Sequence, residues 1–85
     1  MKLQDLLKNI QPVEIAGDVE TEVTGVNIDS RKIKDSHLFV AMKGTQVDGH
    51  KFIPKAIELG AKSILCEDMP EEKVEGVTYV EVEST

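Results

Sequence analysis

The sequence predicts a small, single α/β domain with a mostly parallel or mixed sheet flanked by helices. Two apolar runs of strand length, residues 36–42 and 61–66, lie on either side of a stretch with helical periodicity. Strand, helix, strand in this order is typical of a βαβ unit. The chain has 85 residues, of which 40% are hydrophobic and 31% charged. That composition supports one small hydrophobic core and is too apolar for a disordered chain.

The first half of the chain is expected to contain a short helix followed by strands. Residues 3–10 place leucine and isoleucine at i, i+3, i+4, i+7 spacing, which predicts an amphipathic helix ending before Pro12. Short strands are expected at residues 13–15 and 21–29, with Gly25 as a candidate bulge in the second. The nearly continuous apolar run at 36–42 predicts a strand that is covered on both faces.

The second half is expected to add one helix and two more strands. Residues 51–59 carry apolar side chains at helical spacing, with Pro54 in the first turn and Gly60 as the C-terminal stop. The run at 61–66 predicts a strand. Residues 67–76 are acidic and contain proline and glycine, which predicts a surface loop before a last strand. Because that strand runs to the chain end, we expect the domain to belong to a longer protein.

Composition excludes several classes of protein. A net charge of −6 argues against general nucleic-acid binding, which needs an extended basic surface. The sequence contains neither a signal peptide nor an apolar run long enough to span a membrane, so a cytoplasmic location is the default expectation. The single cysteine, Cys66, cannot form an internal disulfide and lies in an apolar run. A buried thiol is therefore favoured over a nucleophile.

The charge of residues 29–55 differs from that of the rest of the chain. Six of the ten Lys and Arg fall in this segment against three acidic residues, so it carries +3 and the remainder −9. The six are Arg31, Lys32, Lys34, Lys43, Lys51 and Lys55. A locally positive segment rich in loops indicates a site for a phosphate-bearing ligand. The alternative is a solvated basic face.

The first candidate contact in this segment is the polar turn Asp29-Ser30-Arg31, which directly follows a predicted strand. A hydroxyl and a guanidinium at such a place can converge on the oxygens of a phosphate. Asp and Ser are also common turn formers through local hydrogen bonds, so a plain turn is the alternative.

The second candidate is the glycine-bounded loop at residues 44–49, where two glycines let the backbone approach a ligand while Thr45 and Gln46 supply polar side chains. This loop is not a P-loop, because His50 and Lys51 stand where Lys-Ser/Thr would follow. ATP binding by this chain is therefore not expected.

No catalytic residue is predicted. His37 and His50 are the only histidines, and a structural hydrogen-bonding role is favoured over that of a base. No Cys/His cluster supports a transition-metal site. The acidic group at 67–72 has the ligands for a cation, but a solvated loop is favoured. No Ser/His/Asp set can be placed together.

Four stretches together resemble the N-terminal domain of Mur ligases: DSR at 29–31, LFVAMKG at 38–44, DGHKFI at 48–53 and AIELGA at 56–61. The likeness covers nearly the whole chain. It implies that residues 1–85 bind the UDP end of a peptidoglycan precursor. The sequence is most similar to the branch that adds the third amino acid, meso-diaminopimelate or L-lysine, to UDP-N-acetylmuramoyl-L-alanyl-D-glutamate. The branch that adds D-alanyl-D-alanine is an alternative, as is a non-enzymatic acidic interaction domain.

The resemblance also implies site residues and cofactors. By motif position, the substrate contacts fall on Ile28, Ser30, Thr45, Gln46 and Val47. Many members of the family carry His where Thr45 stands, so a ring contact is not assumed there. Arg31 either touches the diphosphate or braces the turn through Asp29. In the family, ATP and Mg²⁺ belong to a central domain and the incoming amino acid to a C-terminal domain. We therefore expect no cofactor and no metal in this domain, and no activity from the chain alone.

Overall fold

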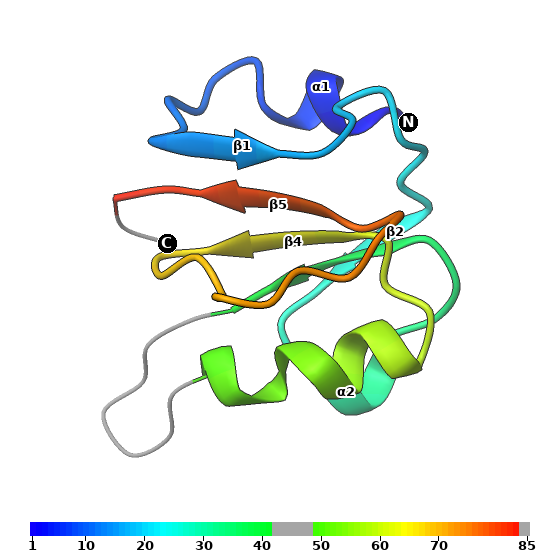
Figure 1. The fold of residues 1–85 in the computed structure, drawn as a ribbon. Coiled ribbons are helices and arrows are strands. Elements are labelled where there is room, and N and C mark those ends of the chain that lie inside the picture. Colours follow the sequence, from blue (N-terminus) through cyan, green and yellow to red (C-terminus); the bar gives the residue numbers. More distant parts are fainter. Residues whose placement is uncertain (42–48, 84–85) are drawn as a thin grey trace.

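The computed structural model describes residues 1–41 and 49–83, which form a mixed five-stranded sheet with helices on both faces. The elements, in chain order, are α1 (Leu3–Leu6), β1 (Glu14–Ala16), β2 (Gly25–Asn27), the 3-10 helix η1 (Ser30–Lys32), β3 (His37–Val40), the 3-10 helix η2 (Gly49–Phe52), α2 (Ile53–Glu58), β4 (Ser63–Cys66) and β5 (Thr78–Glu81). Figure 1 shows how they are arranged. The predicted α/β class is confirmed.

The strands lie in the order β1-β5-β4-β3-β2. Neighbours from β2 to β5 pair in parallel, and β1 pairs antiparallel with β5 at one edge. The arrowheads of β4 and β5 accordingly point the same way in Figure 1, opposite to that of β1. Because four strands are parallel, the segments that follow them all leave the sheet at one edge. That edge is the usual place for ligand binding in sheets of this kind.

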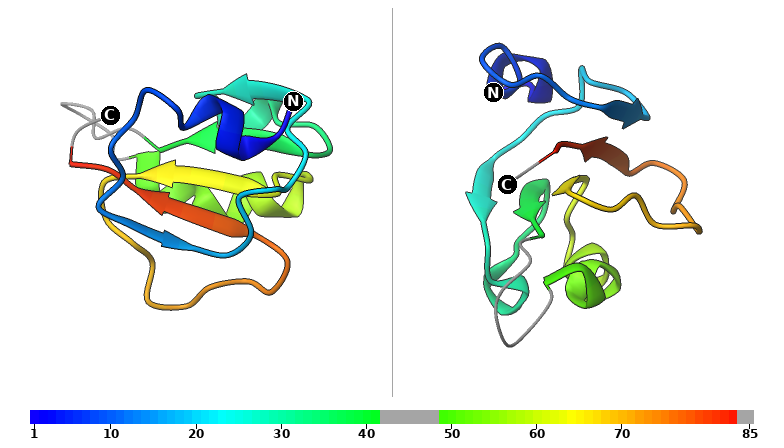
Figure 2. Two further views of the ribbon diagram at one scale, coloured as in Figure 1. Left: turned by 90° about the horizontal axis from the view of Figure 1, so that it is seen from above. Right: turned by 90° about the vertical axis from the view of Figure 1, so that its left-hand side faces the viewer.

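Two hydrophobic clusters fill the two faces of the sheet. On the face covered by α2, Phe39, Ile64 and Tyr79 are almost fully buried. On the other face, Leu38 and Val80 pack with residues of α1 and of the segment before β2. Figures 1 and 2 show α1 and α2 on opposite sides of the sheet. Adjacent residues of β3 thus enter different cores, which confirms the prediction of a strand covered on both faces.

The first helix is shorter than predicted. It spans Leu3–Leu6 instead of residues 3–10. Its first turn is tied down because the backbone N–H of Leu3 donates to the carbonyl of Thr21 at 2.9 Å and Leu3 is fully buried. Ile10, by contrast, is 36% exposed. A short helix needs tertiary packing along its apolar stripe, and here the end of that stripe has little to pack against.

The two glycines that the sequence singles out behave differently. Gly60 ends α2 with a φ of +118°, as predicted for a C-terminal stop. Gly25 is not a bulge, because it pairs in continuous register with His37. A side chain at Gly25 would place its Cβ 2.8 Å from Nε2 of His37. The missing side chain therefore makes room for the imidazole ring and does not bend the strand.

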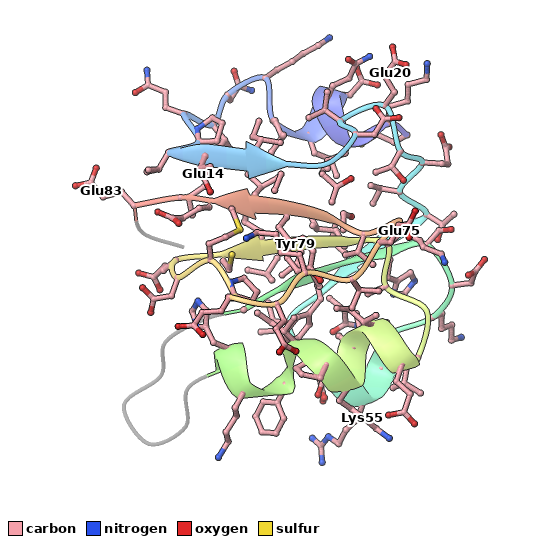
Figure 3. The ribbon with its side chains drawn as sticks, in the orientation of Figure 1. Glu14, Glu20, Lys55, Glu75, Tyr79 and Glu83 are labelled. Carbon is pink, nitrogen blue, oxygen red and sulfur yellow. The ribbon has the colours of Figure 1, made fainter. Side chains whose placement is uncertain are left out.

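The acidic side chains lie on the outside of the fold. Figure 3 shows Glu14, Glu20, Glu75 and Glu83 pointing away from the body of the molecule, whereas Tyr79 lies inside it. Much of the negative charge is therefore solvated. None of the helices in the described part of the chain is long and apolar enough to cross a membrane.

Candidate functional site

The turn that follows β2 is built by side-chain hydrogen bonds to the backbone. Oδ1 of Asn27 accepts from the N–H of Asp29 at 3.0 Å, and Oδ1 of Asp29 accepts from the N–H of Arg31 at 2.9 Å. Asp29 thereby caps η1. Short polar side chains that accept a hydrogen bond from the backbone two residues ahead form compact turns. These two side chains therefore explain why β2 ends at this point. The turn places Ser30 at the first position of η1, with 7% of its surface exposed.

Arg31 braces the turn. Its Nε donates to Oδ1 of Asp29 and its Nη2 to Oδ2, both at 3.1 Å. This two-point pair, together with the backbone N–H of Arg31, holds the pKa of Asp29 below its usual value and raises the pKa of Arg31. Of the two roles considered for Arg31, the structure has the bracing one. The side chain of Arg31 is nevertheless 85% exposed, so much of it still faces solvent.

A cleft of about 540 Å³ opens beside this turn. Its lining residues are Ile28, Asp29, Ser30, Arg31 and Phe52. Among the described residues, the hydroxyl of Ser30 makes no side-chain hydrogen bond to another group. The cleft thus combines a free hydroxyl and a guanidinium with two apolar side chains. A few polar groups in an otherwise apolar hollow are typical of a small-molecule site.

The structure brings together some of the predicted contacts. Ile28 and Ser30 line the same cleft. Thr45, Gln46 and Val47 lie outside the described residues. The chain enters that stretch after β3, whose neighbour β2 runs parallel to it and carries the Asp29 turn.

Phe52 is a cleft residue that sequence reasoning missed, because it was counted in the apolar face of the helix. The buried face of α2 is in fact made by Ile53 and Ala56, while Phe52 is 37% exposed. The spacing of Ile53, Ala56 and Ile57 already completes a helical stripe. The sequence feature that could have identified Phe52 as a cleft residue is its position as an aromatic residue outside that stripe.

Both histidines have structural hydrogen bonds. Nε2 of His50 accepts from the backbone N–H of Glu67 at 2.9 Å and of Asp68 at 3.1 Å. Nδ1 of His37 accepts from the N–H of Lys34 at 3.2 Å. The predicted structural role is therefore confirmed, and η2 is tied to the segment that follows β4.

The remaining candidate side chains of the described residues are the thiol of Cys66 and the acidic groups. Cys66 is a free, fully buried thiol, as predicted. Burial, aided by the charges of Glu81 and Asp68, raises its pKa to about 11, which suppresses the reactive thiolate. Within residues 1–41 and 49–83, no group of three or more His, Cys, Asp and Glu side chains is placed to hold a metal ion.

Comparison with known sequences gives a consistent result. The profile described as "Mur ligase family, catalytic domain" matches residues 22–84. The UDP-N-acetylmuramoyl-L-alanyl-D-glutamate--2,6-diaminopimelate ligase of Bacteroides thetaiotaomicron is 58% identical over 85 residues, which is 100% of this chain and 18% of that protein. The ligase of the same name from Alkaliphilus metalliredigens is 42% identical over 86 residues. The chain thus spans less than a fifth of the length of these relatives.

Solved structures with the same fold are also found. A crystal structure of MurF from Acinetobacter baumannii superposes with a TM-score of 0.84 at 22% identity, over 99% of this chain and 18% of that one. MurF ligase from Thermotoga maritima in complex with ADP gives a TM-score of 0.61 at 30% identity, over 81% of this chain and 15% of that one. At 22% identity, the first likeness speaks for the fold alone.

Proposed function

Because the chain belongs to the Mur ligase family, we propose that residues 1–85 bind the UDP end of UDP-N-acetylmuramoyl-L-alanyl-D-glutamate. The whole protein would then be the ATP-dependent ligase that adds the third amino acid in peptidoglycan biosynthesis. The similarity at 58% identity over the full chain to a ligase of that name supports this choice over the branch that adds D-alanyl-D-alanine. The names of the relatives favour 2,6-diaminopimelate over L-lysine as the amino acid added.

The single observation that carries the proposal is the hydroxyl of Ser30, which lines the cleft at the carboxyl end of β2 and makes no side-chain hydrogen bond within the described part of the chain. It donates to a ligand oxygen, while Ile28 offers an apolar surface next to it. We also place contacts at Thr45, Gln46 and Val47, on the strength of the family motif. Their segment follows β3, the strand adjacent to β2.

The chemistry of the reaction lies outside residues 1–85 in this proposal. ATP, Mg²⁺ and the incoming amino acid would be held by the parts of the longer ligases that this chain does not span. The role of the cleft is positioning. Binding energy from the remote UDP group orients the D-glutamyl carboxylate at a distant reaction centre. We further propose that the protein works in the cytoplasm and needs neither nucleic acid nor a membrane.

Titration of the ¹⁵N-labelled chain with UDP tests the proposal. We expect shifts of backbone amide signals concentrated at residues 28–31, 44–48 and 52. ADP has the same diphosphate but a different base, and it is the matched control ligand. A non-enzymatic interaction surface that attracts anions by charge alone would respond equally to both. Equal shifts with UDP and ADP, or none with millimolar UDP, would refute a uridine site.

Ser30→Ala tests the residue that carries the proposal. The variant removes only the hydroxyl, so the fold and the amide spectrum away from the turn are expected to be unchanged. UDP affinity should fall by about 10-fold or more, since a hydrogen bond to a charged group contributes about 1.5–3 kcal/mol net of competition with water. An unchanged Kd would remove Ser30 from the site.

A further inference from the structure

We propose that Phe52 is the platform on which the ligand's base stacks, with Ile28 as the apolar wall beside it. This inference rests on the proposed function and names a specificity residue that is not among the substrate contacts placed by motif position. Phe52 and Ile28 line one cleft, although they lie far apart in the sequence.

Phe52 is the most exposed of the three aromatic side chains of the chain. The other two aromatic residues of the chain, Phe39 and Tyr79, are each 1% exposed and belong to the core under α2. Phe52 is 37% exposed and lies outside both hydrophobic clusters of the described residues. An aromatic ring that the core leaves partly open to a cleft is available to a ligand.

Ile28 is even more exposed, at 65%. It directly precedes the Asp29 turn and so brings an aliphatic side chain to the same hollow as the ring. An aromatic face together with an aliphatic side chain matches a flat heterocycle better than it matches a phosphate or a sugar. Ser30, also in the cleft lining, supplies a polar contact beside this apolar surface.

The positive charge of Lys51 also favours a nucleotide bound with its base at Phe52. Nζ of Lys51 lies over the Phe52 ring, 5.5 Å from its centroid, so it occupies one face of the ring and leaves the opposite face for a base. The ammonium group therefore lies close to the proposed base site, where it can attract the negatively charged diphosphate attached to the same nucleoside. Asp29 does not oppose this, because its carboxylate is paired with Arg31.

The experiment compares wild type with Phe52→Leu, Phe52→Trp and Leu59→Ala by titration with UDP. Leucine keeps an apolar side chain but has no aromatic face, and tryptophan keeps the face. Leu59, at 38% exposure, matches Phe52 in exposure but does not line the cleft, so it is the control. A second readout is the chemical shift of the uracil H5 and H6 protons, which move upfield when the base lies over an aromatic ring.

We expect Phe52→Leu to raise the Kd for UDP by about 5-fold or more, as for the loss of one base-stacking aromatic residue. The upfield shift of H5 and H6 should disappear in this variant and persist in Phe52→Trp. Leu59→Ala should bind within about 2-fold of wild type.

The outcomes separate the two proposals. If wild type binds UDP but Phe52→Leu binds equally well, or if H5 and H6 do not shift in wild type, the stacking inference is wrong and the uridine site remains. If wild type does not bind UDP at all, both are wrong. Amide spectra of the variants establish that each is folded before its affinity is compared.

Discussion

The substitution Gly60→Ala tests how closely the C-terminal end of α2 packs against the backbone that precedes β3. Gly60 has a φ of +118°, a region that residues with a side chain rarely adopt. A Cβ added there would lie 2.9 Å from Cα of Asp35 and 3.1 Å from its backbone nitrogen. The neighbouring backbone cannot easily move away, because the N–H of Ser36 donates to the carbonyl of Gly60 at 2.8 Å.

The size of the effect follows from three contributions. The unfavourable backbone conformation costs roughly 1–3 kcal/mol. The overlap with Asp35 adds to this cost, and the smaller entropy of the unfolded chain returns about 0.4–1 kcal/mol. We therefore expect the free energy of unfolding to fall by about 2–4 kcal/mol, which is a large share of the stability of a domain this small.

Gly76→Ala is the matched control. Gly76 also has a positive φ, +87°, but a Cβ there would meet nothing within 4 Å. This variant therefore carries the conformational cost without the overlap, and it should lose only about 1–2 kcal/mol. Urea denaturation followed by circular dichroism measures both. If Gly60→Ala is no less stable than Gly76→Ala, the close approach of Gly60 to Asp35 is not as we describe it.

Three further predictions concern single side chains. Ser63→Ala should leave the free energy of unfolding unchanged or raise it by up to about 1 kcal/mol in urea denaturation, because Ser63 Oγ is buried with no hydrogen-bond partner among the described residues; a clear loss would reveal a partner. Cys66, whose pKa is raised to about 11, should resist iodoacetamide at pH 8 until urea unfolds the chain; rapid labelling of the native chain, detected by mass spectrometry, would contradict its burial. The contribution of Cys66 to the free energy of unfolding should be full below pH 9 and decline as pH rises through 11. Asp29→Ala should weaken UDP binding in the NMR titration even though it leaves the cleft more positive, because the cap of η1 and the brace on Arg31 are lost; tighter binding would mean that charge outweighs positioning.

The sequence predicted most of the fold because local signals and tertiary packing agree. Residues 51–59 have an apolar stripe and a proline in the first turn, and Gly60 follows as a stop. All three features agree with the positions of the observed η2 and α2. The run at 36–42 was recognisable as a doubly covered strand because apolar residues at consecutive positions must enter both faces of a sheet.

The errors occurred where packing decided the outcome. The length of α1 depends on which residues of its apolar stripe find a partner. Leu6 and Leu7 pack against the second cluster whereas Ile10 is exposed, and the spacing of apolar residues does not contain that information. Gly25 was given a backbone role, yet its importance lies in the ring of His37 on the neighbouring strand. Phe52 was missed as a cleft residue for the same reason. The exposure of a side chain depends on which residues surround it in the folded protein. Helical spacing at 52–59 does not distinguish the buried apolar positions from the exposed ones.

The orientation of Phe52 depends on a hydrogen-bonded anchor elsewhere on η2. In a 3-10 helix successive residues turn by about 120°, so residues two apart point in different directions. His50 uses its ring to accept two backbone N–H groups after β4, and Phe52 borders the cleft beside β2. The anchor at His50 limits rotation of the short helix, and with it the direction of Phe52. The cleft therefore depends on the segments that follow two different strands: the turn after β2 contains Ser30, and the backbone after β4 anchors η2 and so the aromatic side of the cleft.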